Sequence, residues 1–210
     1  MVVRLPAARR RSQLLEVALE VFAREGYHGT SMDEVAEAAG VTKPVLYQHF
    51  RSKRLLYLEL LDDVGGQLLE EITKAVASAE GPRQQVETGF TAYYEFVVSR
   101  ESAFQLLFGS GARREEEFSE AVRRVEDTIA AWVASLIEAD LEDEHRLFLA
   151  HGIVGLAEST GRRWARERST ARQAAGAAGT EMPDDAGAAL VLARRMAEVT
   201  WAGLRGVHRD

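Results

Sequence analysis

Cysteine is absent from the 210-residue chain, and this absence removes several classes of protein at once. Without thiols the chain forms no disulfide, no thiolate zinc site and no cysteine nucleophile. The sequence also has no stretch that approaches the roughly 18 uninterrupted apolar residues of a membrane span. Its basic start, residues 1–11, is followed by no apolar run and is not typical of a secretory signal. We therefore expect a cytoplasmic protein that does not enter a membrane.

Sequence motifs of common enzymes are missing as well. We find no Gly-rich phosphate loop, no His-Glu-x-x-His zinc motif and no Gly-x-Ser-x-Gly nucleophile elbow. His145 and His151 follow the acidic residues 142–144, but their spacing places the two histidines on different faces of a helix. We therefore expect no enzyme activity, no cofactor and no bound metal.

Strand signals are lacking too, because no segment alternates strictly between polar and β-branched apolar residues. Hydrophobic residues make up 46% and charged residues 28% of the chain, as in ordinary globular proteins. Helical periodicity predicts an all-α fold of about nine helices, with a small domain at residues 1–54 and a larger one at residues 55–210. After the first domain, helices are expected at about residues 53–79, 82–100, 103–108, 113–139, 142–168 and 184–207, with a loop at 169–183 unless its alanines extend a helix.

Residues 31–50 carry the most specific pattern in the chain. Ser31 and Glu34 form a predicted capping box, in which each residue satisfies a backbone N–H of the other at the start of a helix. Gly40 supplies the positive φ that ends this helix, and Thr42 is the expected N-cap of the next. Two short helices joined by a tight turn are typical of a helix-turn-helix motif.

The second helix of this pair is expected to turn Leu46 and Phe50 inward, with Pro44 in its first turn. A helix-turn-helix places the start and outer face of this helix in the major groove of DNA, while hydroxyls and cations hold phosphates. The following helix begins at Ser52, beside the expected path of the DNA backbone. The candidate DNA-binding residues are Ser31, Thr42, Lys43, Pro44, Tyr47, Gln48, His49 and Lys53.

A family resemblance rests on Gly26-Tyr27, Thr30-Ser31-Met32, Ala36, Ala39-Gly40-Val41, Leu46-Tyr47, His49-Phe50 and Ser52-Lys53. With these residues at these spacings, the first quarter of the chain resembles the N-terminal domain of the tetracycline-repressor (TetR) family of transcriptional regulators. The resemblance implies that Thr42, Tyr47, His49 and Lys53 contact phosphates, and that Lys43 and Pro44 approach bases. It also implies a dimer in which ligand binding moves the fourth helix and releases double-stranded DNA.

Asp33 departs from the family pattern. Some members carry a base-reading arginine at this position, in the first turn of the first helix of the motif. An acid would repel phosphates, so we expect Asp33 to favour the positive end of the helix dipole instead. The operator sequence therefore cannot be transferred from other members.

Charge is divided unevenly along the chain. Residues 1–54 hold nine basic and six acidic residues, a net charge of +3, whereas the whole chain carries −7 and the remainder therefore −10. A basic head on an acidic body is typical of a protein that contacts phosphates with one end only. The basic run Arg9, Arg10 and Arg11 is expected to form either a flexible arm that reaches the DNA or a solvated, disordered start.

The last two long helices are rich in small residues, which permit close approach of helices. We predict that they form a four-helix homodimer interface, although an Ala-rich pair within one subunit would show the same pattern. A two-fold dimer would present two heads about one DNA turn or a multiple apart and read a palindrome. The small residues are Ala150, Gly152, Gly155, Ala157, Ser159 and Gly161 in the first helix, and Ala186, Gly187, Ala188, Ala189, Ala193, Ala197, Ala202 and Gly203 in the second.

Aromatic residues are numerous in the second domain, and aromatic walls with few polar groups are typical of a small-molecule pocket. His151 and Glu158 lie two helical turns apart and are candidate polar anchors. Residue by residue, a packed core would explain the aromatics, and a core histidine and an ion pair between Glu158 and Arg162 would explain the anchors. The candidate effector-binding residues are Phe90, Tyr94, Phe108, Trp132, His151 and Glu158.

Together these features predict a homodimeric transcriptional regulator. Our first interpretation is a repressor that a small hydrophobic effector releases from a palindromic operator. A transcriptional activator of the same fold is one alternative. A helical carrier of small molecules that does not bind DNA is another, and an enzyme housed in the aromatic bundle is a third. Sequence-selective, salt-sensitive DNA binding would separate the regulators from the carrier and the enzyme.

Overall fold

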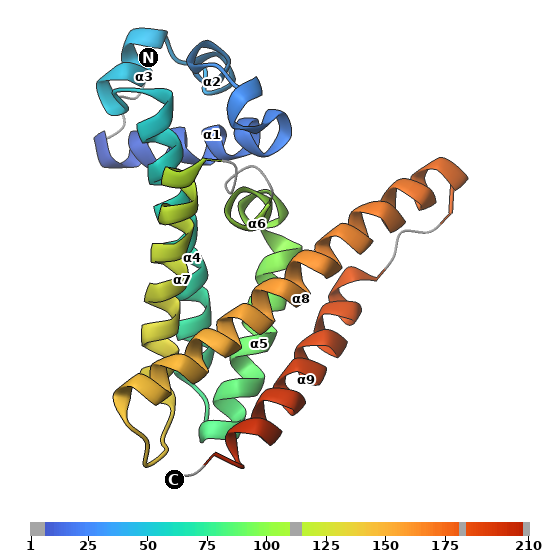
Figure 1. The fold of residues 1–210 in the computed structure, drawn as a ribbon. Coiled ribbons are helices and arrows are strands. Elements are labelled where there is room, and N and C mark those ends of the chain that lie inside the picture. The colour runs from blue at the N-terminus through green and yellow to red at the C-terminus, as the bar shows by residue number, and fades with distance from the viewer. Residues whose placement is uncertain (1–6, 110–114, 181–183, 208–210) are drawn as a thin grey trace. The chain divides into compact units, whose positions relative to one another are not determined.

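The computed structural model describes residues 7–109, 115–180 and 184–207, and its regular elements are all helices (Figure 1). This confirms the all-α prediction. No helix within the described ranges combines the length and apolar character needed to cross a membrane. The helices are α1 (Ala7–Gly29), α2 (Met32–Ala38), α3 (Lys43–His49), α4 (Lys53–Val76), α5 (Pro82–Ser99), α6 (Glu101–Phe108), α7 (Glu116–Leu136), α8 (Asp143–Ala178) and α9 (Asp185–Leu204).

The chain forms two compact units, and their boundary differs from the predicted domain division at residues 54 and 55. The first unit extends to Gly65 and also contains residues 102–122, so it includes most of α6 and the start of α7. The second unit contains residues 66–101 and 123 onward. Both α4 and α7 therefore begin in the first unit and end in the second, and in α4 the boundary falls between Gly65 and Gly66.

The core of the first unit forms around α1. Its apolar side chains recur every three or four residues, and the residues of this stripe that are fully buried include Leu14, Ala18 and Phe22. They pack with apolar residues of α2, α3 and α4, which explains why these short helices are stable together although each alone would be marginal. The buried partners are Met32, Val35, Ala36, Leu46, Phe50, Leu56, Leu60 and Leu61.

The second unit combines α5, α8 and α9, with the ends of α4 and α7. Figure 1 shows α8 and α9 as an antiparallel pair. Small residues allow α5 to approach both of these helices closely. A Cβ added at Gly161 of α8 would lie 2.5 Å from the Tyr93 hydroxyl oxygen of α5. On α9, the residues Ala189, Ala193 and Ala197 are buried.

Glycines with a positive φ interrupt or end two of the helices. The first helix breaks at Gly26, whose φ of 73° and ψ of 168° are not helical, and a short helical segment follows to Gly29. The eighth helix continues through residues 169–178, which confirms the alternative that the alanines of this segment extend a helix, and it ends at Gly179 with a left-handed φ of 65°. Alanine is the best helix former, so its frequency in this segment favours continuation over a loop. The rest of the predicted loop, residues 181–183, lies outside the described residues.

Buried charges fix the extended part of α8 to its neighbours. Arg168 is almost fully buried, and its Nη2 donates to Asp185 at 3.0 Å, in the first turn of α9. Arg172, one turn later, donates to Asp185 at 2.9 Å and to Glu101 at 2.6 Å. Hydrogen bonding from Arg168 lowers the pKa of Asp185 in the folded chain. The ionised carboxylate therefore stabilises the fold above the pKa that this acid has in the unfolded chain, and this contribution is lost as the pH falls through the folded pKa.

Candidate nucleic-acid interface

The turn between α2 and α3 has the geometry that the sequence predicts. The Glu34 N–H donates to the Ser31 hydroxyl oxygen at 3.2 Å, and the Ser31 N–H donates to the Glu34 carboxylate at 2.7 Å. Gly40 ends α2 with a φ of 62°, and the Val41 N–H donates to the Ala36 carbonyl at 3.0 Å. These bonds satisfy the helix ends locally and fix the angle at which α3 leaves the turn.

The short helix α3 is held by two buried side chains and exposes the rest. Leu46 is 0% and Phe50 2% exposed, which confirms the predicted inward pair. Thr42 occupies the N-cap position, but its hydroxyl makes no capping bond. Tyr47 is 41% exposed, and the other exposed residues of this outer face are Thr42, Lys43, Pro44 and Gln48. The face therefore presents hydroxyl, amine and amide groups of the kind that contact DNA.

Lys43 is already engaged in an ion pair. Its Nζ lies 2.8 Å from Asp33 Oδ2, and both side chains are more than half exposed. The hydrogen bond that Lys43 donates to Asp33 raises the pKa of Lys43. Asp33 does lie in the first turn of α2, as expected for the helix dipole, but it also holds the cation that the family resemblance places near bases.

Lys53 lies in a different environment from the one expected of a purely phosphate-binding side chain. Its ammonium donates to the backbone carbonyls of Tyr27 at 2.9 Å and Thr30 at 2.8 Å, and lies 4.5 Å from the centroid of the Tyr27 ring. These contacts join the start of α4 to the turn between α1 and α2. Lys53 therefore has a structural role in the unit.

Arg11 is fixed rather than flexible, so its assignment to a mobile basic arm was wrong. Its guanidinium pairs with both carboxylate oxygens of Glu59 in α4, and Nη1 donates to the His49 carbonyl at 2.6 Å. It also lies 4.4 Å from the centroid of the Phe50 ring. Because Arg11 contacts the last residues of α3 from α1, it helps to set the position of the half-buried His49. Arg9 is exposed and Arg10 half-buried, and both lie on helix α1.

The start of α7 packs on the same unit through an aromatic cluster. The Phe118 ring lies 4.6 Å from that of Tyr27 and 4.7 Å from that of Tyr57, measured between centroids. Two ion pairs flank the cluster, between Arg54 and Glu117 at 2.5 Å and between His28 and Glu115 at 3.2 Å. Tyr27 thus contacts both α7 and the Lys53 ammonium, which connects α7 to the turn before α2.

Ionisation of Tyr57 should weaken the fold at alkaline pH. Burial raises the pKa of this phenol from 10.0 to about 12, so the folded chain keeps it neutral where the unfolded chain ionises it. Stability is therefore retained below about pH 10 and lost as the pH rises toward 12. Urea unfolding between about pH 8 and pH 11 should show a falling midpoint in the wild type and a smaller fall in Tyr57→Phe. Identical pH profiles for the two proteins would contradict the assignment to Tyr57.

The candidate effector-binding residues are divided between the two units. Phe108 is buried in the first unit, whereas Phe90 and Tyr94 are buried in the second, where the Tyr94 hydroxyl bonds to Thr160 at 2.7 Å. Trp132 is half-buried. The structure thus brings Phe90 and Tyr94 onto the same helix, α5, and leaves Phe108 on α6.

The two candidate polar anchors also differ in position. His151 is exposed and lies 3.8 Å from Asp127, so it is not the core histidine that was considered. Glu158 pairs with Arg162 at 3.3 Å, which confirms the alternative of an ion pair one turn apart, although its side chain is only 14% exposed.

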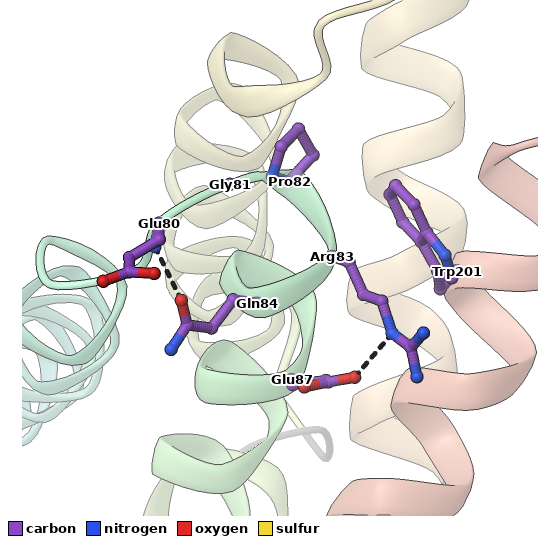
Figure 2. A pocket seen from close by; sticks show the side chains of 7 residues that line it. All are labelled: Glu80, Gly81, Pro82, Arg83, Gln84, Glu87 and Trp201. Carbon is purple, nitrogen blue, oxygen red and sulfur yellow. Dashed lines mark hydrogen bonds and ion pairs between the residues drawn. The ribbon is translucent and has the colours of Figure 1, made fainter.

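A hollow of about 450 Å³ opens in the second unit between the start of α5 and the end of α9 (Figure 2). In Figure 2 the Arg83 side chain reaches from α5 toward Trp201 of α9, and it pairs with Glu87 at 2.9 Å. None of the six candidate effector-binding residues lines this hollow. Its lining residues are Glu80, Gly81, Pro82, Arg83, Gln84, Glu87 and Trp201.

The small residues of α8 and α9 face two ways. Ala150, Gly161 and the three buried alanines of α9 are covered within the chain, so the alternative of an intramolecular pair holds for them. The remaining small residues on these helices are mostly exposed, and they are interspersed with large apolar side chains that are also exposed. The exposed set comprises Phe148, Gly152, Gly155 and Ser159 of α8, and Ala186, Ala188, Leu190, Val191, Val199, Ala202 and Gly203 of α9.

Comparison with known proteins covers both units. Residues 14–60 match the model of the bacterial regulatory proteins of the tetR family, and residues 82–182 match a tetracyclin repressor-like C-terminal domain. The chain is 35% identical to the HTH-type transcriptional activator FasR of Mycolicibacterium smegmatis over 163 residues, which is 77% of this chain and 74% of that protein. It is 34% identical to the HTH-type transcriptional repressor KstR2 of Rhodococcus jostii over 94 residues, 45% of this chain and 46% of that one.

Solved structures agree with these sequence matches. A TetR-like transcriptional regulator from Rhodococcus sp. RHA1 superposes with a TM-score of 0.69 at 26% identity, covering 97% of this chain and 100% of that one. The helix-turn-helix geometry, the two matched domains and a relative that aligns over three quarters of the sequence lead to one conclusion. The chain belongs to the TetR family of DNA-binding transcriptional regulators.

Proposed function

We propose that this regulator is a homodimer that binds a palindromic double-stranded operator through α3 and acts as a repressor, from which a small hydrophobic effector releases it. The observation that carries the proposal is the outer face of α3, where Thr42, Lys43, Tyr47 and Gln48 are exposed while Leu46 and Phe50 anchor the helix. Residues 1–54 would bind DNA, and residues 55–210 would bind the effector and dimerise. The proposed place of action is the cytoplasm.

Each candidate residue has a proposed role. Thr42, Tyr47 and His49 would contact phosphates, as would the Ser31 hydroxyl, which accepts a bond from Glu34 and still has its hydrogen to donate. Lys43, Pro44 and Gln48 would face bases. Lys53 would support the phosphate contacts mainly by holding the turn before α2. The proposed effector-binding residues are those of the candidates that lie in the second unit, Phe90, Tyr94, Trp132, His151 and Glu158.

Tyr47→Ala is the variant that tests DNA binding. We expect it to weaken binding to the DNA upstream of the protein's own gene by about tenfold, because the variant loses the hydroxyl that would contact a phosphate and the ring that carries it. Mobility-shift titrations against bulk competitor DNA measure this loss. Arg24→Ala is the control, since Arg24 is an exposed cation on α1 that pairs with its neighbour Glu25. If Tyr47→Ala binds as tightly as the wild type, α3 does not dock as proposed.

The homodimer is proposed from the exposed apolar residues of α8 and α9. Such residues are rarely left in contact with water over a continuous surface, and the small residues between them allow close packing of a second pair of helices. We expect Val199→Asp, at a side chain that is 60% exposed, to convert the dimer to a monomer. Sedimentation or light scattering measures this, with the exposed Leu55→Asp of α4 as the control. A wild-type protein that is monomeric would refute the proposed interface.

Transcriptional activation is the second candidate function. FasR, which aligns over 74% of its length, is an activator, whereas KstR2 is a repressor, so the family relationship alone favours neither direction. A reporter driven by the bound promoter distinguishes them. Expression should rise on deletion of a repressor gene and fall on deletion of an activator gene.

A further inference from the structure

The ion pair between Asp33 and Lys43 links the first turn of α2 to the first turn of α3. Its atoms Oδ2 and Nζ lie 2.8 Å apart, and the two side chains are 65% and 51% exposed. Because both side chains are exposed, neither charge needs the other to offset a cost of burial, and exposed ion pairs contribute little to stability. Its position on the face that would approach DNA therefore calls for a reason other than folding.

Asp33 is unfavourable for general attraction to DNA. Its carboxylate repels phosphates, and it neutralises the Lys43 ammonium, which would otherwise add to the binding of any duplex. Glu34 already closes the capping box of α2, so the helix end is satisfied without Asp33. The pair thus reduces the sequence-independent affinity for DNA. A compensating gain in affinity must come from groups on the DNA that a carboxylate and an ammonium can contact together.

A G·C base pair offers such groups in the major groove. Guanine presents two acceptors, N7 and O6, and cytosine presents a donor, the N4 amino group, beside them. The side-chain pair presents donors from Lys43 next to acceptors from Asp33. An A·T pair also presents an acceptor and a donor, adenine N7 and the N6 amino group. At the position where cytosine presents its amino group, however, it places the thymine O4 acceptor and methyl group, so a carboxylate at that end of the pair finds no donor.

We propose that Asp33 and Lys43 act as one composite reader of a G·C base pair in each operator half-site, with Lys43 donating to guanine and Asp33 accepting from cytosine. This inference rests on the proposed function, because it requires α3 to lie in the major groove. It assigns Asp33, which departs from the arginine of some family members, a part in choosing the sequence.

Selection from a random duplex library tests the proposal with the full-length protein. Duplexes randomised over about two helical turns are selected by the wild type and by Asp33→Ala, Lys43→Met and the double variant, and the bound sequences are read. The wild type should prefer a G·C pair at one position of each half-site by about tenfold. Either single variant should lose most of this preference, and the double variant should lose no more than the singles.

A charge exchange provides the sharpest comparison. The variant Asp33→Lys with Lys43→Asp keeps both charges and the ion pair but exchanges donor and acceptor, so its preference should shift to C·G at the same position. Glu37→Gln, at an exposed acid of α2, is the matched control and should leave every base preference unchanged. Thermal melts of all variants establish that the first unit is folded.

Three results would overturn the inference, and they differ in what they imply for the proposed function. If Asp33→Ala strengthens binding to all duplexes equally and keeps the base preferences, Asp33 acts only through its charge. If the double variant loses about as much as both singles added together, the two residues do not read as a unit. If the wild type selects no sequence at all, operator binding itself is wrong, and the inference fails with it.

Discussion

Replacement of Leu46 by alanine is expected to abolish sequence-selective DNA binding while the proposed dimer is retained. Leu46 is fully buried and, with Phe50, anchors α3 to α1 and α2. Truncating a buried leucine costs about 2–5 kcal/mol, which is a large part of the stability of a small helical unit. Because the second unit has its own core, unfolding should remain local to the first unit. Mobility-shift assays and light scattering on the same preparation measure both effects.

Leu55→Ala is the control for this prediction. It makes the same chemical change at a leucine of α4 that is 48% exposed, and it should cost less than about 1 kcal/mol. Urea unfolding of the two variants should therefore differ clearly at the transition of the first unit. Equal stability and equal DNA affinity in Leu46→Ala and wild type would mean that α3 is not held by this side chain.

Gly161→Ala is expected to destabilise the second unit by about 1–3 kcal/mol. A Cβ at this position would lie 2.5 Å from the Tyr93 hydroxyl oxygen and 3.0 Å from its Cε1. Tyr93 is buried in α5 and its ring cannot turn away into solvent, so α5 and α8 would have to separate. Denaturant titrations followed by helical circular dichroism should show a lower midpoint for this variant.

A second substitution should partly restore the stability of this variant. Tyr93→Phe removes the oxygen that the new methyl group would meet first, and leaves the ring carbons at 3.0 and 3.1 Å. Gly66→Ala in α4 is the matched control, because a Cβ there meets no atom within 4 Å and alanine favours a helix by about 1 kcal/mol. If Gly161→Ala is as stable as Gly66→Ala, the contact with Tyr93 is looser than the structure describes.

The helix-turn-helix could be predicted from the sequence because its determinants are local. Ser31 and Glu34 satisfy each other's backbone three residues apart, and Gly40 adopts a positive φ because it has no Cβ to clash there. The inward orientation of Leu46 and Phe50 follows from helical spacing alone. Such short-range patterns determine both helices of the motif and the face of α3 that stays exposed.

Contacts between distant residues could not be predicted in the same way. The guanidinium of Arg11 bonds across 48 residues to Glu59, and Lys53 bonds across 26 residues to Tyr27. In the sequence both looked like surface cations near DNA, because composition does not reveal which carbonyl or carboxylate a long side chain will meet. The sequence would have indicated a structural role only for a lysine or arginine that stood among the apolar residues of a buried helix face.

Small residues posed a related problem in α8. Periodicity showed that Gly161 permits close approach of another helix, but it did not show which helix. The structure assigns this position to Tyr93 of the same chain, while Gly152 and Gly155 remain exposed. Likewise, aromatic content alone did not show that Phe90 and Tyr94 are buried on α5 while Phe108 is buried on α6.

The two adjacent glycines in α4 have a mechanical consequence. They lie where one compact unit ends and the next begins, in the middle of a continuous helix of 24 residues. Glycine resists bending less than any other helical residue, and glycine-containing pairs are common sites of helix kinks. We therefore expect α4 to yield at this joint before its hydrogen-bonded halves deform, so that each half moves as a stiff rod.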